Sequence, residues 1–183
     1  MENCVKAMLY CYPRLESITD GYLQHIKNKA ALSYDGKTPT WELAEYLAGE
    51  VLNKQRVQEL KLLLDNALKN LTVEEKLLLD VRYFGKLDQV RRLFAAKAAS
   101  LADDYMREIK IWSERTYFRK QARLLKKIIR RLSAAELDKQ SFLEKFASLD
   151  GVSAVYQYIE LGKDIGMERK EREFLAFLNR IRN

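Results

Sequence analysis

Residues 113–131 read SERTYFRKQARLLKKIIRR, and this stretch combines a helical pattern of apolar residues with an unusual concentration of charge. It holds eight Lys and Arg residues against one acid, Glu114, whereas the other 164 residues hold 25 basic and 25 acidic side chains. The formal net charge of the 183-residue chain, +7, therefore falls within this one segment. A charge confined to one predicted helix is what a polyanion-binding surface requires, so nucleic acid is the leading class of partner.

The same segment predicts an amphipathic helix that is anchored on one side. Ser113 suits an N-cap, and Glu114 suits the first turn, where an acid interacts favourably with the helix dipole. Apolar residues recur at steps of three and four, so they define a face that must pack against the rest of the protein. These residues are Tyr117, Phe118, Leu124, Leu125, Ile128, Ile129 and Leu132.

The polar side of this helix supplies the candidate nucleic-acid-binding residues. If the first two turns enter a major groove, their side chains reach base edges, and later cations lie nearer the phosphates. The candidate base-contacting residues are Arg115, Thr116, Arg119, Lys120 and Arg123. The candidate phosphate-contacting residues are Lys126, Lys127, Arg130 and Arg131.

Three other interpretations of the basic side stay open. It could be a solvated face paired with acids elsewhere on the fold, which is how most runs of charge end up. It could bind an acidic protein. Attachment to an anionic membrane surface is less favoured, because the apolar face is needed for the core and no lipidation motif is visible.

Composition favours long helices and argues against an enzyme. Only seven Gly and two Pro occur, and 32% of the residues are charged. No apolar run approaches the roughly 20 residues that span a bilayer. There is one histidine, His25, and no metal-spaced Cys/His set, phosphate loop or nucleophile elbow. We therefore expect no catalysis, no metal and no cofactor. Cys4 and Cys11 are expected to be buried thiols in a reduced, cytoplasmic setting.

The remaining sequence predicts an all-α, multi-helix bundle in three regions. Region 1–70 has a helix to Leu32 interrupted near Pro13, a loop, and a long helix over 41–70 with Thr40 as N-cap. The apolar residues of that long helix, Val51 among them, are expected mostly on one side, for core packing or, less commonly, for a dimer contact. Region 71–132 starts a helix at Thr72 that stops near Gly85, followed by helical segments over 87–110 and then the basic helix. Trp112, just before that helix, is expected to help anchor it. Region 133–183 opens with an apparent capping box at Ser133–Glu136 and continues with helices through Phe142 and Phe146, over 152–161 and over 168–181.

Two stretches together resemble a known family. Residues 71–84, LTVEEKLLLDVRYF, resemble the start of the sigma-70 region 4 type of helix-turn-helix, and residues 113–128, SERTYFRKQARLLKKI, are similar to its recognition helix. The resemblance implies a helix-turn-helix-like centre whose positioning helix and turn fall in segment 85–112. It also implies that the basic helix reads promoter or operator DNA in the major groove, with RNA polymerase as a candidate protein partner.

These observations predict a DNA-binding transcriptional regulator that acts on double-stranded DNA. The alternative is a non-enzymatic helical interaction module whose basic face binds an acidic protein. A homodimer is a candidate assembly, because many such regulators bind paired half-sites. Either the long helix over 41–70 or the C-terminal helices would supply its contact.

Overall fold

The computed structural model describes residues 1–32, 39–85, 113–149 and 151–162, and every regular element within these ranges is helical. The predicted all-α fold class is therefore confirmed for the described part of the chain. The elements are α1 (Glu2–Cys11), the 3₁₀ turn η1 (Tyr12–Arg14), α2 (Leu15–Leu32), α3 (Thr40–Leu68), α4 (Val73–Arg82), α7 (Glu114–Ala134), α8 (Lys139–Lys145) and α9 (Val152–Glu160). The helices expected over 87–110 and 168–181, and Trp112, lie outside the described residues.

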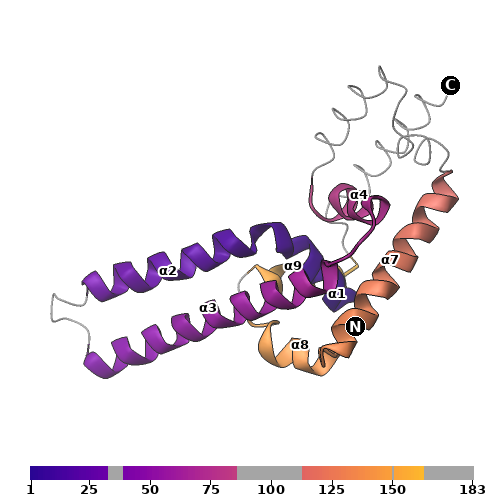
Figure 1. Ribbon diagram of the computed structural model, residues 1–183. Helices are drawn as coiled ribbons and strands as arrows, with labels where there is room; N and C mark the ends of the chain where they lie inside the picture. The colour runs from indigo at the N-terminus through magenta and orange to yellow at the C-terminus, as the bar shows by residue number, and fades with distance from the viewer. Residues whose placement is uncertain (33–38, 86–112, 150, 163–183) are drawn as a thin grey trace, which may run out of the picture.

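Helices α2 and α3 run antiparallel as a two-helix arm that projects from the rest of the molecule (Figure 1). The other helices gather at one end of this arm, and we call them the body. Within the arm, Lys61 of α3 forms an ion pair with Glu16 of α2, and His25 Nδ1 lies 3.6 Å from Glu50 Oε2. Helix α3 continues from the arm into the body, where it contacts α1 and α7. It is therefore the element that connects the two parts.

The hydrophobic core lies mainly in the body, around α1. Val5, Met8 and Leu9 of this helix are completely buried, and α1 contacts both α9 and α7. Phe142 and Phe146, in and just after α8, are also completely buried. One continuous core therefore joins residues from the first, middle and later parts of the chain.

The interruption predicted near Pro13 is confirmed. The α-helical pattern gives way to the 3₁₀ turn η1, in which Pro13 occupies one of the first two positions. A proline lacks a backbone N–H, but at the start of a helix that group has no acceptor within the helix. The turn therefore accommodates Pro13 without loss of a hydrogen bond, and α2 begins directly afterwards at Leu15.

The long helix expected over 41–70 is confirmed as α3, with small differences at its ends. The N-cap is Pro39, and Thr40, which was expected as the cap, is the first helical residue. The helix ends because Lys69 is extended (ψ 146°) and Asn70 is left-handed (φ 55°), a conformation that asparagine tolerates better than most residues.

Most of the apolar residues expected on one side of α3 are buried or partly buried, and Val51 is the exception. Val51 was assigned to the same stripe as Leu43 and Leu47, yet it is 41% exposed. The reason is geometric: a step of four residues turns about 40° beyond a full turn, so two such steps carry Val51 about 80° away from Leu43. The buried residues of α3 begin only further along the helix, at Val57.

The helix expected to start at Thr72 is confirmed as α4. Thr72 and Glu75 form a complete capping box, in which each side chain accepts from the backbone N–H of the other residue. The helix ends at Arg82, and Gly85 follows in a left-handed conformation (φ 65°). Segment 86–112, which would hold the positioning helix and turn of a helix-turn-helix, lies outside the described residues, so this finer prediction stays a prediction.

The capping box predicted at Ser133–Glu136 was wrong, because Ser133 lies in the last turn of α7. The chain leaves this helix through Glu136, which is left-handed (φ 60°), and the backbone N–H of Leu137 donates to the carbonyl oxygen of Leu132. Asp138 is the real cap of α8, accepting from the Ser141 N–H at 2.7 Å. This arrangement is a helix C-terminus, with Leu137 buried against the core.

Candidate nucleic-acid interface

Helix α7, the predicted basic helix, starts as its sequence indicated. The side chain of Ser113 accepts a hydrogen bond from the backbone N–H of Thr116 at 3.3 Å, so Ser113 is the N-cap. The hydroxyl groups of Ser113 and Thr116 also lie 3.0 Å apart and hydrogen bond. The Thr116 hydroxyl, a candidate base-contacting group, is therefore engaged at the helix start.

The inner side of α7 packs against the body. Tyr117, Leu124, Ile128 and Leu132 are buried there, as their spacing predicted. Phe118 was expected with them but is 41% exposed, because it follows Tyr117 by one residue and so lies about 100° further round the helix.

A glutamine, Gln121, is also buried on this inner side. Nothing in the sequence predicted that this polar residue would be buried. Gln121 is only 7% exposed, and its Nε2 donates to the carbonyl oxygen of Leu78 in α4 at 2.9 Å and to the hydroxyl of Tyr117 at 3.1 Å. Since a buried amide without partners would cost free energy, these bonds fix how α7 sits on α4.

Three of the basic residues of α7 make contacts inside the protein, and we call Lys120, Lys127 and Arg131 the inner row. Lys120 forms an ion pair with Glu74 of α4. Lys127 donates to both carboxylate oxygens of Glu75, at 2.7 and 2.8 Å. These pairs connect residues 46 and 52 positions apart in the sequence. They attach α7 to the first turn of α4.

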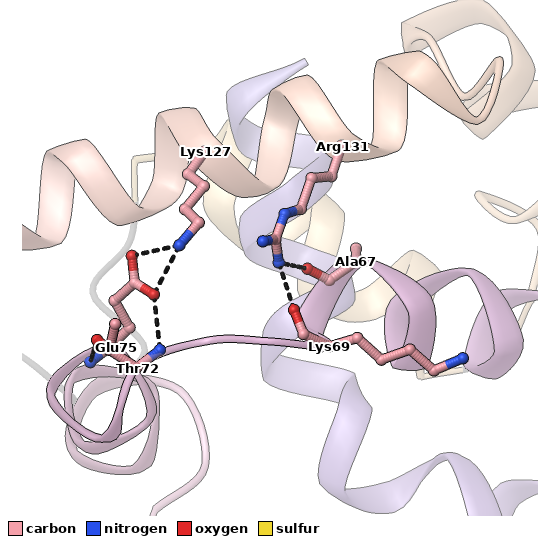
Figure 2. Close-up of polar contacts among 6 residues, drawn as sticks. All are labelled: Ala67, Lys69, Thr72, Glu75, Lys127 and Arg131. Carbon is pink, nitrogen blue, oxygen red and sulfur yellow. Dashed lines mark hydrogen bonds and ion pairs between the residues drawn. The ribbon is translucent and has the colours of Figure 1, made fainter.

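Arg131 attaches α7 to the end of α3 (Figure 2). Its Nη1 donates to the carbonyl oxygens of Ala67 and Lys69 at 2.7 and 2.6 Å. The last carbonyl oxygens of a helix receive no hydrogen bond from a backbone N–H of the same helix, and they carry the negative end of the helix dipole. The guanidinium group therefore satisfies both the hydrogen bonding and the charge at this helix terminus.

Glu75 lies at the centre of the second contact in Figure 2. One of its oxygens accepts from Lys127 and the other from both Lys127 and the backbone N–H of Thr72. Burial alone would raise the pKa of this carboxyl, but the hydrogen bonds from Lys127 and Thr72 outweigh it, and the pKa is lowered. Glu75 therefore stays charged, and it holds both the start of α4 and the side of α7.

The other five basic residues of α7 are exposed, and we call them the outer row. They follow one another at steps of four, four, three and four residues, which at about 100° per residue keeps them within an arc of about 80°. From the first to the last the row is about 22 Å long. Its members are Arg115, Arg119, Arg123, Lys126 and Arg130.

Within the described residues, no acid forms an ion pair with the outer row. The carboxyl of Glu2 lies near enough to Lys126 to be affected by it. Its pKa is lowered first by the hydrogen bond from Lys6, and Lys126 adds a smaller contribution in the same direction. The outer row is therefore a line of five positive charges facing solvent.

The structure thus separates the nine candidate binding residues into groups. Five form the outer row, three form the inner row and contact α3 or α4, and Thr116 hydrogen bonds to the N-cap. The sequence contained one signal for this division: Lys120, Lys127 and Arg131 share a side of the helix about 40° wide, next to the buried face. Their partners could not be identified without the position of α4.

Other site chemistry was searched for in the described ranges. No group of three His, Cys, Asp or Glu side chains there is arranged to hold a metal ion. Among the described helices, none has the length and apolar character needed to cross a membrane. Cys4 and Cys11 are buried and unlinked, as expected. Comparisons with protein families, with curated proteins and with solved structures find no match to this chain.

Proposed function

We propose that this protein is a DNA-binding transcriptional regulator that holds duplex DNA against the outer row of α7 and carries out no catalysis. The observation that carries the proposal is the division of the basic residues. Ion pairs neutralise Lys120 and Lys127, whereas Arg115, Arg119, Arg123, Lys126 and Arg130 remain on one exposed side. Solubility depends on the net charge and does not require five like charges to lie in one line, whereas binding of a long polyanion does.

The dimensions of the outer row suit a nucleic-acid duplex. B-form DNA carries one negative charge per about 1.7 Å of its axis, so a row about 22 Å long faces many phosphates. A major groove about 12 Å wide admits one α-helix. With α7 in the groove, Arg115, Arg119 and Arg123 are the base-reading candidates, and Lys126 and Arg130 contact the phosphates.

The inner row gives this binding surface a rigid support. Contacts to Glu74, to Glu75 and to the end of α3 fix the rotation of α7 about its own axis. A fixed rotation keeps the outer row turned to solvent, which reduces the ordering cost of binding. The resemblance of segments 71–84 and 113–128 to sigma-70 region 4 is the reason to propose duplex DNA, with RNA polymerase as a protein partner.

Fluorescence anisotropy with a duplex of about 30 base pairs, at several salt concentrations, tests the proposal. At roughly 0.9 for each phosphate contact, Lys126 and Arg130 alone predict a log–log slope of about −1.8, and a slope of about −4.5 is the limit if all five cations of the outer row contact phosphates. The triple variant Arg119→Glu, Arg123→Glu, Lys126→Glu should weaken binding more than about a hundredfold, since each reversed charge removes an attraction and adds a repulsion.

The control is a second triple variant with the same change of net charge at three cations outside α7. Arg14, Lys27 and Lys139 are exposed cations outside α7, and reversing all three should weaken binding far less. Equal losses in both triple variants, or no binding by the natural sequence at low salt, would contradict the proposal. In the second case, capture of an acidic protein from nuclease-treated lysate would favour the alternative of a protein-binding basic face.

A further inference from the structure

Helix α3 has a second apolar side, which no described residue covers. It faces away from α2 and includes large hydrophobic side chains that are unusually exposed. Trp41 is 67% exposed, Leu62 61% and Leu52 46%. The opposite side of the same helix holds the buried residues Val57 and Leu64, which pack in the core. A helix with apolar residues on two opposite sides needs two neighbours, and the described structure supplies neighbours on one side.

The uncovered side follows the spacing of a coiled coil. Seven positions separated by alternating steps of three and four residues are all exposed and all uncharged, although α3 contains eight charged residues. Alternating steps of three and four are the a and d positions of the heptad repeat. The repeat extends over about 32 Å of helix. Its positions, which we call the seam, are Trp41, Ala44, Ala48, Val51, Gln55, Gln58 and Leu62.

Charges beside the seam indicate what covers it. With Trp41 as an a position, Glu45 and Glu59 occupy e positions, and Lys54 and Lys61 occupy g positions. In a parallel two-stranded coiled coil, each g residue faces the next e residue of the other helix. A second copy of α3 would therefore bring Lys54 against Glu59 of the partner subunit. An antiparallel pair brings e against e and g against g, which would place like charges together.

The residues between these charges agree with the same register. Leu47 is a g position and Leu52 is the following e position, so two copies would pair them through an apolar contact. Ala44 and Ala48 are small and allow the helices to approach. Lys61 already pairs with Glu16, and Glu59 with Lys145, but these ion pairs are exposed and contribute little free energy. They would therefore not prevent Lys61 and Glu59 from lying beside a second copy of α3.

We propose that the seam of α3 is a homodimer interface, in which the α3 helices of two copies form a parallel coiled coil with α2 on the outside. The surface lies on the arm, and the outer row lies on α7, so the proposal does not rest on DNA binding. Each can fail while the other stands.

Light scattering of the full chain over a range of concentrations tests the dimer. We expect a mass near twice 21.5 kDa, with dissociation on dilution. Ala48→Glu should raise the dissociation constant more than about a hundredfold, because two carboxylates would face each other in an apolar interface. Ala154→Glu is the control, at an alanine in α9 that is also exposed, and should leave the dimer unchanged.

Several outcomes would overturn the proposal. A mass of 21.5 kDa at about 100 μM would show that the chain is a monomer and would overturn the proposal. The seam would then be a binding surface for a helix of another protein. A dimer that survives Ala48→Glu would overturn the proposal as well. Circular dichroism should show unchanged helicity in both variants, because both positions are exposed in the single chain.

Cysteine cross-linking tests the parallel register. Ala44 lies at a d position and faces its own copy in a parallel dimer, whereas an antiparallel pair would separate the two by about 20 Å or more. Ala44→Cys should therefore form a disulfide-linked dimer on mild oxidation. Tyr46→Cys, on the same helix but off the seam, should stay monomeric on a non-reducing gel. A dimer in solution without cross-linking of Ala44→Cys would overturn the parallel arrangement.

Discussion

Arg130 and Arg131 are chemically identical neighbours in α7 with different surroundings. Arg131 is partly buried and donates to two carbonyl oxygens at the end of α3, whereas Arg130 is exposed in the outer row. The difference follows from the rotation of about 100° between successive helical residues. A count of positive charges therefore overstates the number available for a ligand, and the surroundings of each residue must be known.

The pair allows a direct test of stability at the residue scale. Arg131→Ala should lower the free energy of unfolding by about 1.5–3 kcal/mol, because it removes charge-assisted hydrogen bonds and leaves the carbonyl oxygens of Ala67 and Lys69 without their donor. Arg130→Ala should change it by less than about 0.5 kcal/mol. Urea denaturation followed by circular dichroism measures both. Similar values for the two variants would show that the contact in Figure 2 contributes no stability.

The cysteines give a second residue-scale prediction. Burial raises the pKa of the Cys11 thiol to about 11, and burial also raises that of Cys4. Because the thiolate is the reactive form, neither should react with a disulfide reagent at pH 8 in the folded protein. Both thiols should react once the chain is unfolded in guanidinium. Rapid reaction of either thiol in the native protein would contradict the burial described for α1.

At the scale of elements, local signals were predictable and distant partners were not. The N-cap Ser113 and the helix start at Thr72 were identified correctly, because a capping side chain and the backbone N–H that donates to it lie within three residues of each other. Ser133 was misassigned, since the same short motif occurs inside a helix as well as before one. The ion pair between Lys120 and Glu74 joins residues far apart, so only the packing of α7 on α4 reveals it.

The Glu75 contact predicts a pH dependence for the attachment of α7 to α4. Its pKa is lowered in the folded protein, so its contribution to stability is present above the unfolded pKa and is lost as the pH falls through the folded value. At pH 7, Glu75→Gln should lower the free energy of unfolding by about 1–2 kcal/mol, because the ion pair and part of the capping box are lost.

Below about pH 4.5 the difference between the natural sequence and Glu75→Gln should shrink, since the carboxyl of the unfolded chain then binds a proton, and it should vanish once the pH falls below the lowered pKa of the folded state. Urea titrations at several pH values from 7 to 3 measure it. Glu16 is a suitable control, because its carboxyl also pairs with a lysine but is fully exposed. A difference between natural sequence and Glu75→Gln that stays constant with pH would contradict this account.

For the whole molecule, the arm and the body should differ in local stability. Buried residues in α3 begin at Val57, so the outer half of this helix has few contacts to hold it in a single chain. Amide hydrogens over residues 41–52 should therefore exchange faster than those over 57–68. The sequence predicted the length of α3 correctly but not its two-sided character, which appears only when the position of α2 is known.

Protein concentration should change this exchange pattern if the seam is covered by a second copy. Binding stabilises the bound state according to ligand concentration, so protection over 41–52 should rise between about 2 and 200 μM. Hydrogen exchange with mass spectrometry measures it, and residues 121–132 of α7, which lie outside the seam, serve as the internal reference. Identical exchange at both concentrations would count against a dimer through the arm.

The two-sided character of α3 also restricts how the arm can change length during evolution. Inserting one residue would rotate everything beyond it by about 100°, turning the seam toward α2 and the buried side toward solvent. Seven residues amount to nearly two complete turns and keep both sides aligned while lengthening the arm by about 10.5 Å. Related chains should therefore have arms that differ by multiples of seven residues, with matching insertions in α2.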